Sequence, residues 1–365
     1  MTNEDRPERP LFGIRTISHG EKVVYDDSAD AVVARLRAKP VIVNLFIDGP
    51  DSVFDPQELA DYLIHSFGSN FHVENHGDIM QVALLTKDKE FIVGSLAKAK
   101  LVRYGGYGPP LPIGEKDKFR LEEEVLLRKP GVPIRQFLRE QRLTKFDSLS
   151  LNGYYDVWSL RDAYSQMLPE ELRGSESSRQ VALVITGRGI GQMEQGRVHM
   201  RGGGSMGTLS VISTTGLVDA PGKPIEVEVA MDRTNRLGFL PNFNDPELTR
   251  QFIEVIKERG LSQEIVEETM NMMFRDKMLS HDDPRINEAI KGMALSFVLY
   301  TLGEYGKVFQ CSTTDLSAGS PDLSKFCRLH DSHWQEELIA VQIKNPGQPE
   351  FCDYHTELFD KLGNT

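Results

Sequence analysis

Cysteine is scarce in this chain, with only three among 365 residues: Cys311, Cys327 and Cys352. An odd number of thiols spread this thinly does not suit a disulfide framework, which small secreted proteins build from closely spaced cysteines. We therefore expect thiols that stay reduced or bind a metal ion, in a protein of the cytoplasm.

Basic residues are fewer than acidic ones: the chain has 42 lysines and arginines and 54 aspartates and glutamates, which gives a net charge of -12. Binding to phosphate backbones needs clustered basic side chains, and the lack of a long basic stripe excludes nucleic acid as a partner. Long apolar runs are also lacking. The longest, at 293–302, is half of what a bilayer span requires, and residues 1–10 are charged, so we expect no membrane partner.

The hydrophobic pattern predicts an α/β fold with a mixed sheet. Continuous apolar runs at 41–47 and 181–186 are typical of strands covered on both faces. A helix at Pro56–Phe67, with Asp55 at its N-cap, follows the first run, and this order predicts a right-handed crossover within one sheet. Further strands are expected at 71–74, 79–85, 208–214 and 225–231.

The C-terminal part is predicted to be mainly helical, with helical periodicity at 246–259, 263–278, 284–302, 333–343 and 351–362. Short helices are expected earlier, at 133–142 and 159–167, whereas 105–131 is rich in glycine, proline and charge and is predicted to be irregular. Residues 1–38 are predicted to form a flexible extension, and residues 39–365 a single α/β domain, with a subdivision near 232–245 as the alternative.

A glycine-rich run, Gly187-Arg188-Gly189-Ile190-Gly191, follows the second apolar strand. Such a run can cradle a phosphate when a helix begins directly after it. Its spacing is G-x-G-x-G rather than G-x-G-x-x-G, and no amphipathic helix follows. We interpret it as a strand-ending loop and keep a nucleotide-binding enzyme as the weakest functional hypothesis.

Potential metal ligands crowd into residues 326–337, where Cys327, His330 and His333 lie close together. Thiolate sulfur and imidazole nitrogen are the ligands that complete the tetrahedral shell of zinc. Ser332 and Gln335 form a capping box, which predicts a helix beginning at His333 and places the other two ligands in the loop before it. With Cys311 as a fourth ligand, the set predicts a structural zinc site. Plain packing of a buried thiol is the alternative.

Carboxylates near these ligands could orient a metal-bound histidine. Glu337 lies four residues after His333, and Glu336 lies beside it, so either is a candidate for this role, with a surface contact as the alternative. Cys352 and His355 form a second C-x-x-H pair, which we interpret as incidental. The group His281-Asp282-Asp283 offers ligands too, but capping of the following helix explains its acids.

The buried helix at 284–302 has the outline of a zinc-protease helix. Such helices carry H-E-x-x-H-x-x-G-x-x-H, whose histidines bind zinc and whose glutamate acts as general base. When the sequence is aligned with this pattern, the ligand positions are occupied by Ser296, Tyr300 and Gly306, and the position of the base is occupied by Phe297. These residues supply neither strong ligands nor a proton acceptor, so we expect no catalytic zinc on this helix.

Several of these runs together resemble one family. The runs at 282–285, 291–295 and 327–329, Cys311, and His333-Trp334-Gln335-Glu336-Glu337 are similar to a little-studied, mostly archaeal family of metallopeptidases. A second signature lies at 212–221. The resemblance, and at greater distance that to archaemetzincins, implies a zincin-like α/β fold over roughly residues 40–345. The two cysteines of that family lie closer together, so 312–326 corresponds to an insertion.

Two functional hypotheses follow from these residues. In the first, the chain is a zincin-like protein that lacks the usual catalytic zinc, carries a structural zinc and acts by binding a peptide or protein partner. In the second, it is an active metal-dependent hydrolase that uses ligands within 311–337, with His281 as a further candidate.

Overall fold

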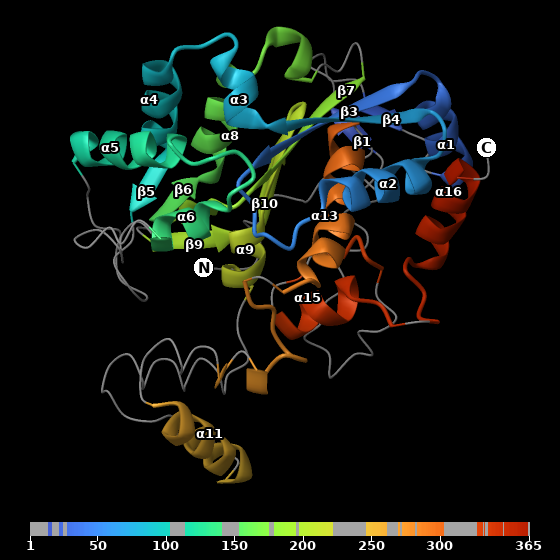
Figure 1. The fold of residues 1–365 in the computed structure, drawn as a ribbon. Coiled ribbons are helices and arrows are strands. Elements are labelled where there is room, and N and C mark those ends of the chain that lie inside the picture. The colour runs from blue at the N-terminus through green and yellow to red at the C-terminus, as the bar shows by residue number, and fades with distance from the viewer. Residues whose placement is uncertain are drawn as a thin grey trace, which may run out of the picture.

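Figure 1 shows the computed structural model of the chain, which combines sheets and helices throughout its length. The structure describes residues 14–16, 22–24, 28–102, 114–140, 153–174, 179–194, 197–221, 246–260, 269–270, 272–281, 283–302, 327–330, 332, 335–345 and 347–363. The fold is α/β with mixed sheets, as the sequence predicts.

The central sheet has five strands in the order β10-β11-β7-β3-β4, of which the last four are parallel and β10 is antiparallel. Its strands are β3 (Val41–Asp48), β4 (Phe71–Asp78), β7 (Gln180–Thr186), β10 (Gly203–Met206) and β11 (Leu209–Ser213). The apolar runs predicted as covered strands form its centre, since the residues of β7 from Val181 onward are fully buried.

The two faces of this sheet are covered by different helices. The chain leaves β3 through α2 (Pro56–Phe67) to reach β4, and it reaches β7 on the other side of β3 through α8 (Val157–Met167). Helices α1 (Ala29–Arg37), α2, α13 (Ile286–Thr301), α15 (Gln335–Gln342) and α16 (Asp353–Gly363) bury one face, while α3 (Ile79–Leu84), α4 (Lys89–Ala99) and α8 bury the other. The connection after β3 therefore leads to β4 on one side of β3, and the later connection leads to β7 on its other side. In α/β proteins, ligands typically bind at such a point, outside the carboxyl ends of the strands.

A second sheet of four strands lies beside the first, in the order β5-β6-β8-β9. Its strands are β5 (Lys100–Val102), β6 (Gly153–Asp156), β8 (Gly189–Glu194) and β9 (Arg197–Arg201), and a separate pair joins β1 (Ile14–Thr16) to β2 (Lys22–Val24). Most of the glycine run predicted as a loop is thus strand. At Gly189 a side chain is excluded, because a Cβ would lie 2.8 Å from the Tyr154 ring.

Two predicted elements are wrong. Residues 79–85, predicted as a strand, begin with helix α3 (Ile79–Leu84), because Asp78 accepts a hydrogen bond from the backbone N–H of Met80 and caps a helix there. The segment 105–131, predicted to be irregular, contains α5 (Glu115–Leu126), whose inner face buries Leu121 and Val125. The cap thus decides the structure of α3, whereas buried residues on one face favour the helix α5, which the composition of its segment does not indicate.

Five further helices agree with the sequence prediction within a few residues: α6 (Ile134–Glu140), α11 (Pro246–Arg259), α13 (Ile286–Thr301), α15 (Gln335–Gln342) and α16 (Asp353–Gly363). Helices α4 (Lys89–Ala99) and α9 (Thr214–Asp219) and the short 3-10 turn η1 (Glu170–Leu172) were not predicted. The predicted strand at 225–231 and the subdivision near 232–245 lie outside the described residues. Of the predicted helix at 263–278, residues 263–268 and 271 also lie outside them, while 269–270 and 272–273 are helical and 274–277 form a turn.

Within the segment predicted as a flexible extension, residues 29–37 form helix α1 (Ala29–Arg37). Its Val32 and Leu36 are 1% exposed and belong to the core between the sheet and α16, so the α/β domain includes α1. Among the described helices, none combines the length and the apolar character that a bilayer crossing requires.

Candidate functional site

Three potential metal ligands meet beside the start of α16. Ligand atoms of Cys327, Cys352 and His355 all lie within 4.8 Å of one another. The Nδ1 atom of His355 is 3.5 Å from the sulfur of Cys327 and 3.2 Å from that of Cys352. Cys327 and His355 are buried, and Cys352 is half-buried, so the group is largely shielded from water.

Local structure brings these residues together. Cys352 directly precedes α16 and His355 lies in its first turn, so the C-x-x-H spacing places both side chains at the same end of the helix. Cys327 begins a tight turn in which the N–H of His330 donates to its carbonyl. The N–H of Arg328 donates to the carbonyl of Glu350, and this bond holds the turn against the residues before α16.

The donor atoms match what zinc requires. Zn–S bonds of about 2.3 Å and Zn–N bonds of about 2.0–2.1 Å in a tetrahedron put sulfur and nitrogen ligands about 3.5 Å apart. The two S–N separations here, 3.5 and 3.2 Å, are close to that value. The group can therefore hold a metal ion with three protein ligands.

The turn that carries Cys327 docks tightly on α13. At Gly292 of α13 a Cβ would lie 2.1 Å from the side-chain oxygen of Gln342 and 2.5 Å from the carbonyl oxygen of Arg328. The guanidinium of Arg328 lies 2.9 Å from Glu288 and 3.1 Å from Glu350. Close backbone approach at a glycine and a partly buried ion pair thus fix the position of the turn.

Substituting Gly292 by alanine tests this docking. We expect Gly292→Ala to lower the free energy of unfolding by about 1–3 kcal/mol, because the new methyl group overpacks a backbone contact. Gly94 of α4 is the matched control, since a Cβ there would meet only Phe119 at 3.8 Å. Gly94→Ala should be neutral or stabilising by up to about 1 kcal/mol, the helix-propensity gain. Equal effects of the two variants in urea unfolding would contradict the docking.

The remaining predicted site residues are placed as follows. His330 is outside the metal group, and its Nε2 lies 3.0 Å from Glu337 in a buried pair. Glu336 is half-exposed and pairs with Lys277 at 3.3 Å. Cys311, His333 and Gly306 lie outside the described residues.

Helix α13 has no metal-ligand set at the positions of the zinc-protease pattern. Ser296, Phe297 and Tyr300 are half-buried on it. Phe297 packs against strand β10, where a Cβ at Gly203 would lie 2.7 Å from its ring and 2.9 Å from the sulfur of Met293. Apolar side chains therefore occupy the contact between α13 and β10.

The C-x-x-H pair of Cys352 and His355 is visible in the sequence, where it is interpreted as incidental. The structure brings the pair next to Cys327 through a long-range contact that the spacing alone does not indicate. That contact arises because α16 packs against α2 and α1, in the core that also contains the buried Cys327.

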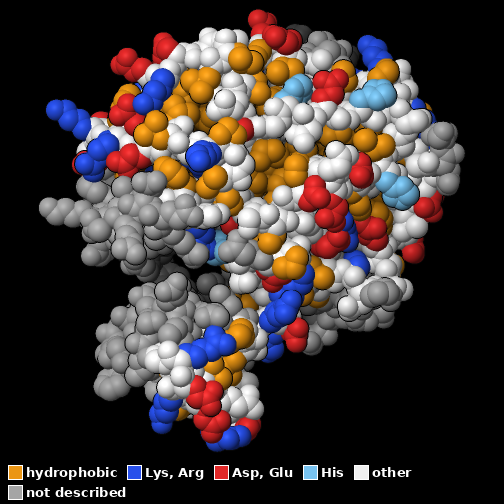
Figure 2. All heavy atoms as spheres, in the orientation of Figure 1, with side chains coloured by type: hydrophobic (Ala, Val, Ile, Leu, Met, Phe, Trp, Pro, Cys, Tyr) orange, Lys and Arg blue, Asp and Glu red, His pale blue; other side chains and the backbone are white. Residues whose placement is uncertain are grey.

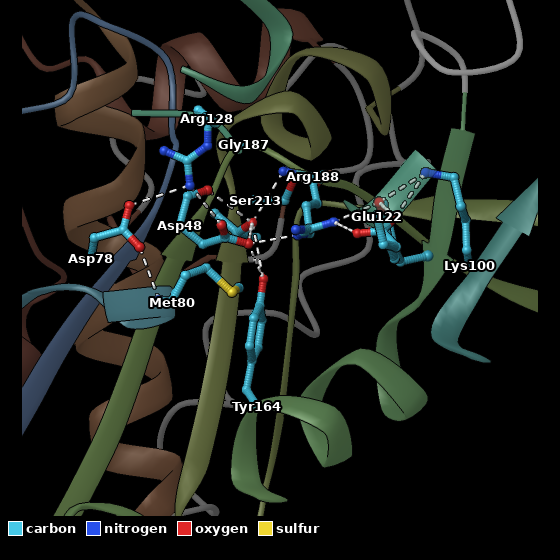
Figure 3. A network of polar contacts seen from close by, with 12 residues as sticks. Asp48, Asp78, Met80, Lys100, Glu122, Arg128, Tyr164, Gly187, Arg188 and Ser213 are labelled. Carbon is cyan, nitrogen blue, oxygen red and sulfur yellow. Dashed lines mark hydrogen bonds and ion pairs between the residues drawn. The ribbon is translucent and has the colours of Figure 1, made fainter. Parts of the chain in front are cut away.

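A second concentration of polar residues lies at the carboxyl edge of the central sheet, where β3 and β7 end (Figure 3). The Arg188 guanidinium lies between two buried carboxylates, with Nε 2.6 Å from Asp48 and Nη1 2.7 Å from Glu122. Burial raises the pKa of the Glu122 carboxyl, but the charges of Arg188 and Lys100 outweigh burial and hold it at about 2. Burial also raises the pKa of the Asp48 carboxyl, but the charges of Arg188 and Arg128 outweigh burial and lower it below its ordinary value.

Further partners complete the network. Arg128 lies 3.3 Å from both Asp48 and Asp78, Tyr164 donates to Asp48 at 2.6 Å, and Lys100 lies 3.1 Å from Glu122. Three cationic and three anionic side chains thus balance within the network. The protein's own charges therefore occupy the carboxyl ends of β3 and β7.

This arrangement contradicts the phosphate-cradle hypothesis for the glycine run. The N–H of Gly187 donates to the carbonyl of Asp48, and the N–H of Arg188 donates to the hydroxyl of Thr186. A Cβ at Gly187 would lie 2.0 Å from the carbonyl oxygen of Gly49, so two backbone segments touch where a phosphate would bind. The N–H groups at the start of the run are therefore used within the protein.

Comparison with known proteins gives one result. The profile of a family of unknown function, DUF7001, matches residues 50–358, which is most of the chain. No curated protein and no solved structure matches the chain. The resemblance to a metallopeptidase family therefore stays a prediction.

Proposed function

The chain belongs to DUF7001, a family of unknown function, and for this member we propose a non-catalytic binding protein that is stabilised by a structural zinc ion. The zinc is held by Cys327, Cys352 and His355, with Cys311 as the proposed fourth ligand. The frame is zincin-like, the location is the cytoplasm, and the partner is a peptide or a protein.

The donor set and the burial of the three ligands support a structural role for the metal. Zinc sites in which cysteine predominates are typically closed, and a catalytic site keeps one position open for water. Cys327 is 3% exposed and His355 is 1% exposed, so little room for a substrate exists at these ligands. The ion would join the start of α16 to the turn at Cys327, which docks on α13.

The residues of helix α13 at the positions of the zinc-protease pattern argue against catalysis. The zincin resemblance implies a buried central helix in this part of the chain, where α13 is largely buried, and the residues of α13 at the ligand positions of the zinc-protease pattern are Ser296 and Tyr300. Phe297 stands where a peptidase has its general base, and its ring packs on Gly203 of β10. A peptidase must polarise a carbonyl and activate a water molecule, and these side chains do neither.

The partner site that we propose is the edge of the central sheet. In the described part of the chain, β10 pairs with β11 alone, so β10 is one edge strand of the central sheet, and β4 is the other. An extended peptide can add to such an edge as a further strand. Lys and Arg side chains are scattered over the face drawn in Figure 2 rather than gathered in one patch, which is consistent with a partner other than nucleic acid.

We predict that the purified protein cleaves no peptide or protein substrate in a chelator-sensitive manner. The assay compares the unmodified chain, the chelator-treated chain and His355→Ala over a mixture of unstructured peptides, with products identified by mass spectrometry. Turnover that disappears with chelator and in His355→Ala, but persists in Tyr300→Phe, would refute the proposal. It would show instead an active hydrolase that works through the cysteine and histidine ligands.

A further inference from the structure

Three segments that are distant in the sequence converge outside the carboxyl ends of the central strands. Asp51 lies three residues after β3, Asp219 is the last residue of the helix that follows β11, and His281 precedes α13. Ligands of α/β proteins bind at this edge of the sheet. The group lies apart from Cys327, Cys352 and His355 in the sequence and shares no residue with them.

The imidazole of His281 lies between the two carboxylates. Its Nε2 is 3.5 Å from Oδ1 of Asp219, and its Nδ1 is 3.7 Å from Oδ2 of Asp51. Asp219 in turn accepts a hydrogen bond from the hydroxyl of Tyr154 at 3.2 Å. The side chains of Asp51, His281 and Asp219 are 3%, 15% and 26% exposed, so the group is mostly buried but reaches the surface at Asp219.

The distance between Nδ1 of His281 and Oδ2 of Asp51 bears on what can lie between these two atoms. Nδ1 of His281 is buried and makes no hydrogen bond to the described residues. If Nε2 carries the proton and faces Asp219, the lone pair of Nδ1 points toward a carboxylate oxygen, and a proton or a cation must lie between them. A proton would draw the two atoms to about 2.7–2.9 Å, whereas they are 3.7 Å apart.

A metal ion explains this separation. Nitrogen and oxygen ligands at about 2.0–2.2 Å from one ion, with an angle of about 110–120° between them, lie about 3.3–3.8 Å apart. Metal-bound histidines commonly donate their second ring N–H to a carboxylate, which fixes the tautomer and the ring orientation. Asp219 occupies that position here, and Tyr154 holds Asp219.

We propose that Nδ1 of His281 and the carboxylate of Asp51 bind a divalent cation, with Asp219 as the carboxylate that orients the imidazole. One nitrogen and one oxygen ligand, with water in the remaining positions, suit cations such as Mn²⁺, Fe²⁺ and Zn²⁺. This cation site shares no ligand with the proposed structural zinc site. Experiments can therefore contradict one of the two proposals without contradicting the other.

Mn²⁺ is the probe that separates the two sites, because carboxylate and imidazole bind it while thiolates select softer metals. The full-length protein with its native zinc is titrated with MnCl₂, and free Mn²⁺ is measured by electron paramagnetic resonance. We expect about one Mn²⁺ per chain, and loss of this binding in Asp51→Asn and in His281→Gln. Asp219→Asn should weaken it by about tenfold to 100-fold.

Glu336→Gln is the matched control, since it removes one negative charge from a half-exposed carboxylate that pairs with Lys277. It should bind Mn²⁺ as the unmodified protein does, and zinc content and unfolding midpoint are recorded for every variant. His281→Gln keeps the test decisive if Asp51→Asn fails to fold. An unmodified protein that binds no Mn²⁺, unchanged binding in His281→Gln, or equal loss in Glu336→Gln would each overturn the proposal.

Discussion

Replacing Arg188 by methionine is expected to lower the free energy of unfolding by about 3–5 kcal/mol, the cost of leaving buried charges without their partner. The guanidinium is 1% exposed and contacts Asp48 and Glu122, both fully buried. Methionine has a similar volume, so the variant removes the charge and its hydrogen bonds while keeping most of the packing. The loss should be visible in urea or thermal unfolding.

The control for this variant is Arg250→Met. Arg250 also contacts two carboxylates, Glu247 at 2.6 Å and Glu254 at 3.0 Å, but it is 58% exposed. Solvent screens such pairs, so we expect little change in stability. If both arginine variants lose the same stability, the buried network contributes no more than a surface pair does.

The stabilisation from Asp48 and Glu122 depends on pH in a defined direction. Both pKa values lie below their ordinary values of 3.8 and 4.5 in the folded protein, that of Glu122 at about 2. A carboxylate whose pKa is depressed by folding stabilises the protein fully above its ordinary pKa and loses this effect as the pH falls toward the folded value. The deficit of Arg188→Met should therefore be full at neutral pH and shrink between about pH 4.5 and 2.

Cys352→Ser is expected to lose the bound zinc and with it at least about 3 kcal/mol of stability, since structural zinc contributes about 10–16 kcal/mol of binding energy in small domains. Cys352 is half-buried and its sulfur lies 3.2 Å from the His355 ring. Serine keeps the size and polarity of the side chain but is a far weaker zinc ligand.

The protein from which a chelator has removed zinc provides the matched control for this substitution. Once zinc has been removed, the unmodified chain and Cys352→Ser should unfold at nearly the same denaturant concentration, because the substitution then has no metal to lose. A variant that keeps a full complement of zinc, or that is equally destabilised with and without metal, would argue against Cys352 as a ligand.

The strands at the centre of the fold could be predicted because burial on both faces leaves a local mark. The continuous apolar residues of β3 and β7 form such a mark, and the capping of α2 by Asp55 forms another. Helix α3 was missed because its six residues are almost all apolar, which fits a strand equally well. Only the cap at Asp78 decides between the two.

The sites were harder to predict because their geometry depends on contacts between distant segments. Cys327 and His355 are 28 residues apart, and Asp48 and Arg188 are 140 residues apart. Nothing in the sequence around Arg188 indicates that its charge is buried, since an arginine after a strand is usually exposed. The sequence places Cys327 in a candidate ligand group, but the residues that could share a metal ion with it in the described structure are His355 of α16 and Cys352 directly before that helix.

X-ray absorption at the zinc edge of the purified protein tests the central claim most directly. We expect about one zinc per chain, in a four-coordinate shell that contains at least two sulfur atoms, from Cys327 and Cys352, and at least one imidazole nitrogen, from His355. The spectrum of His355→Ala should lose a nitrogen contribution. A protein that purifies without zinc, or a zinc shell made of oxygen and nitrogen alone, would contradict the account.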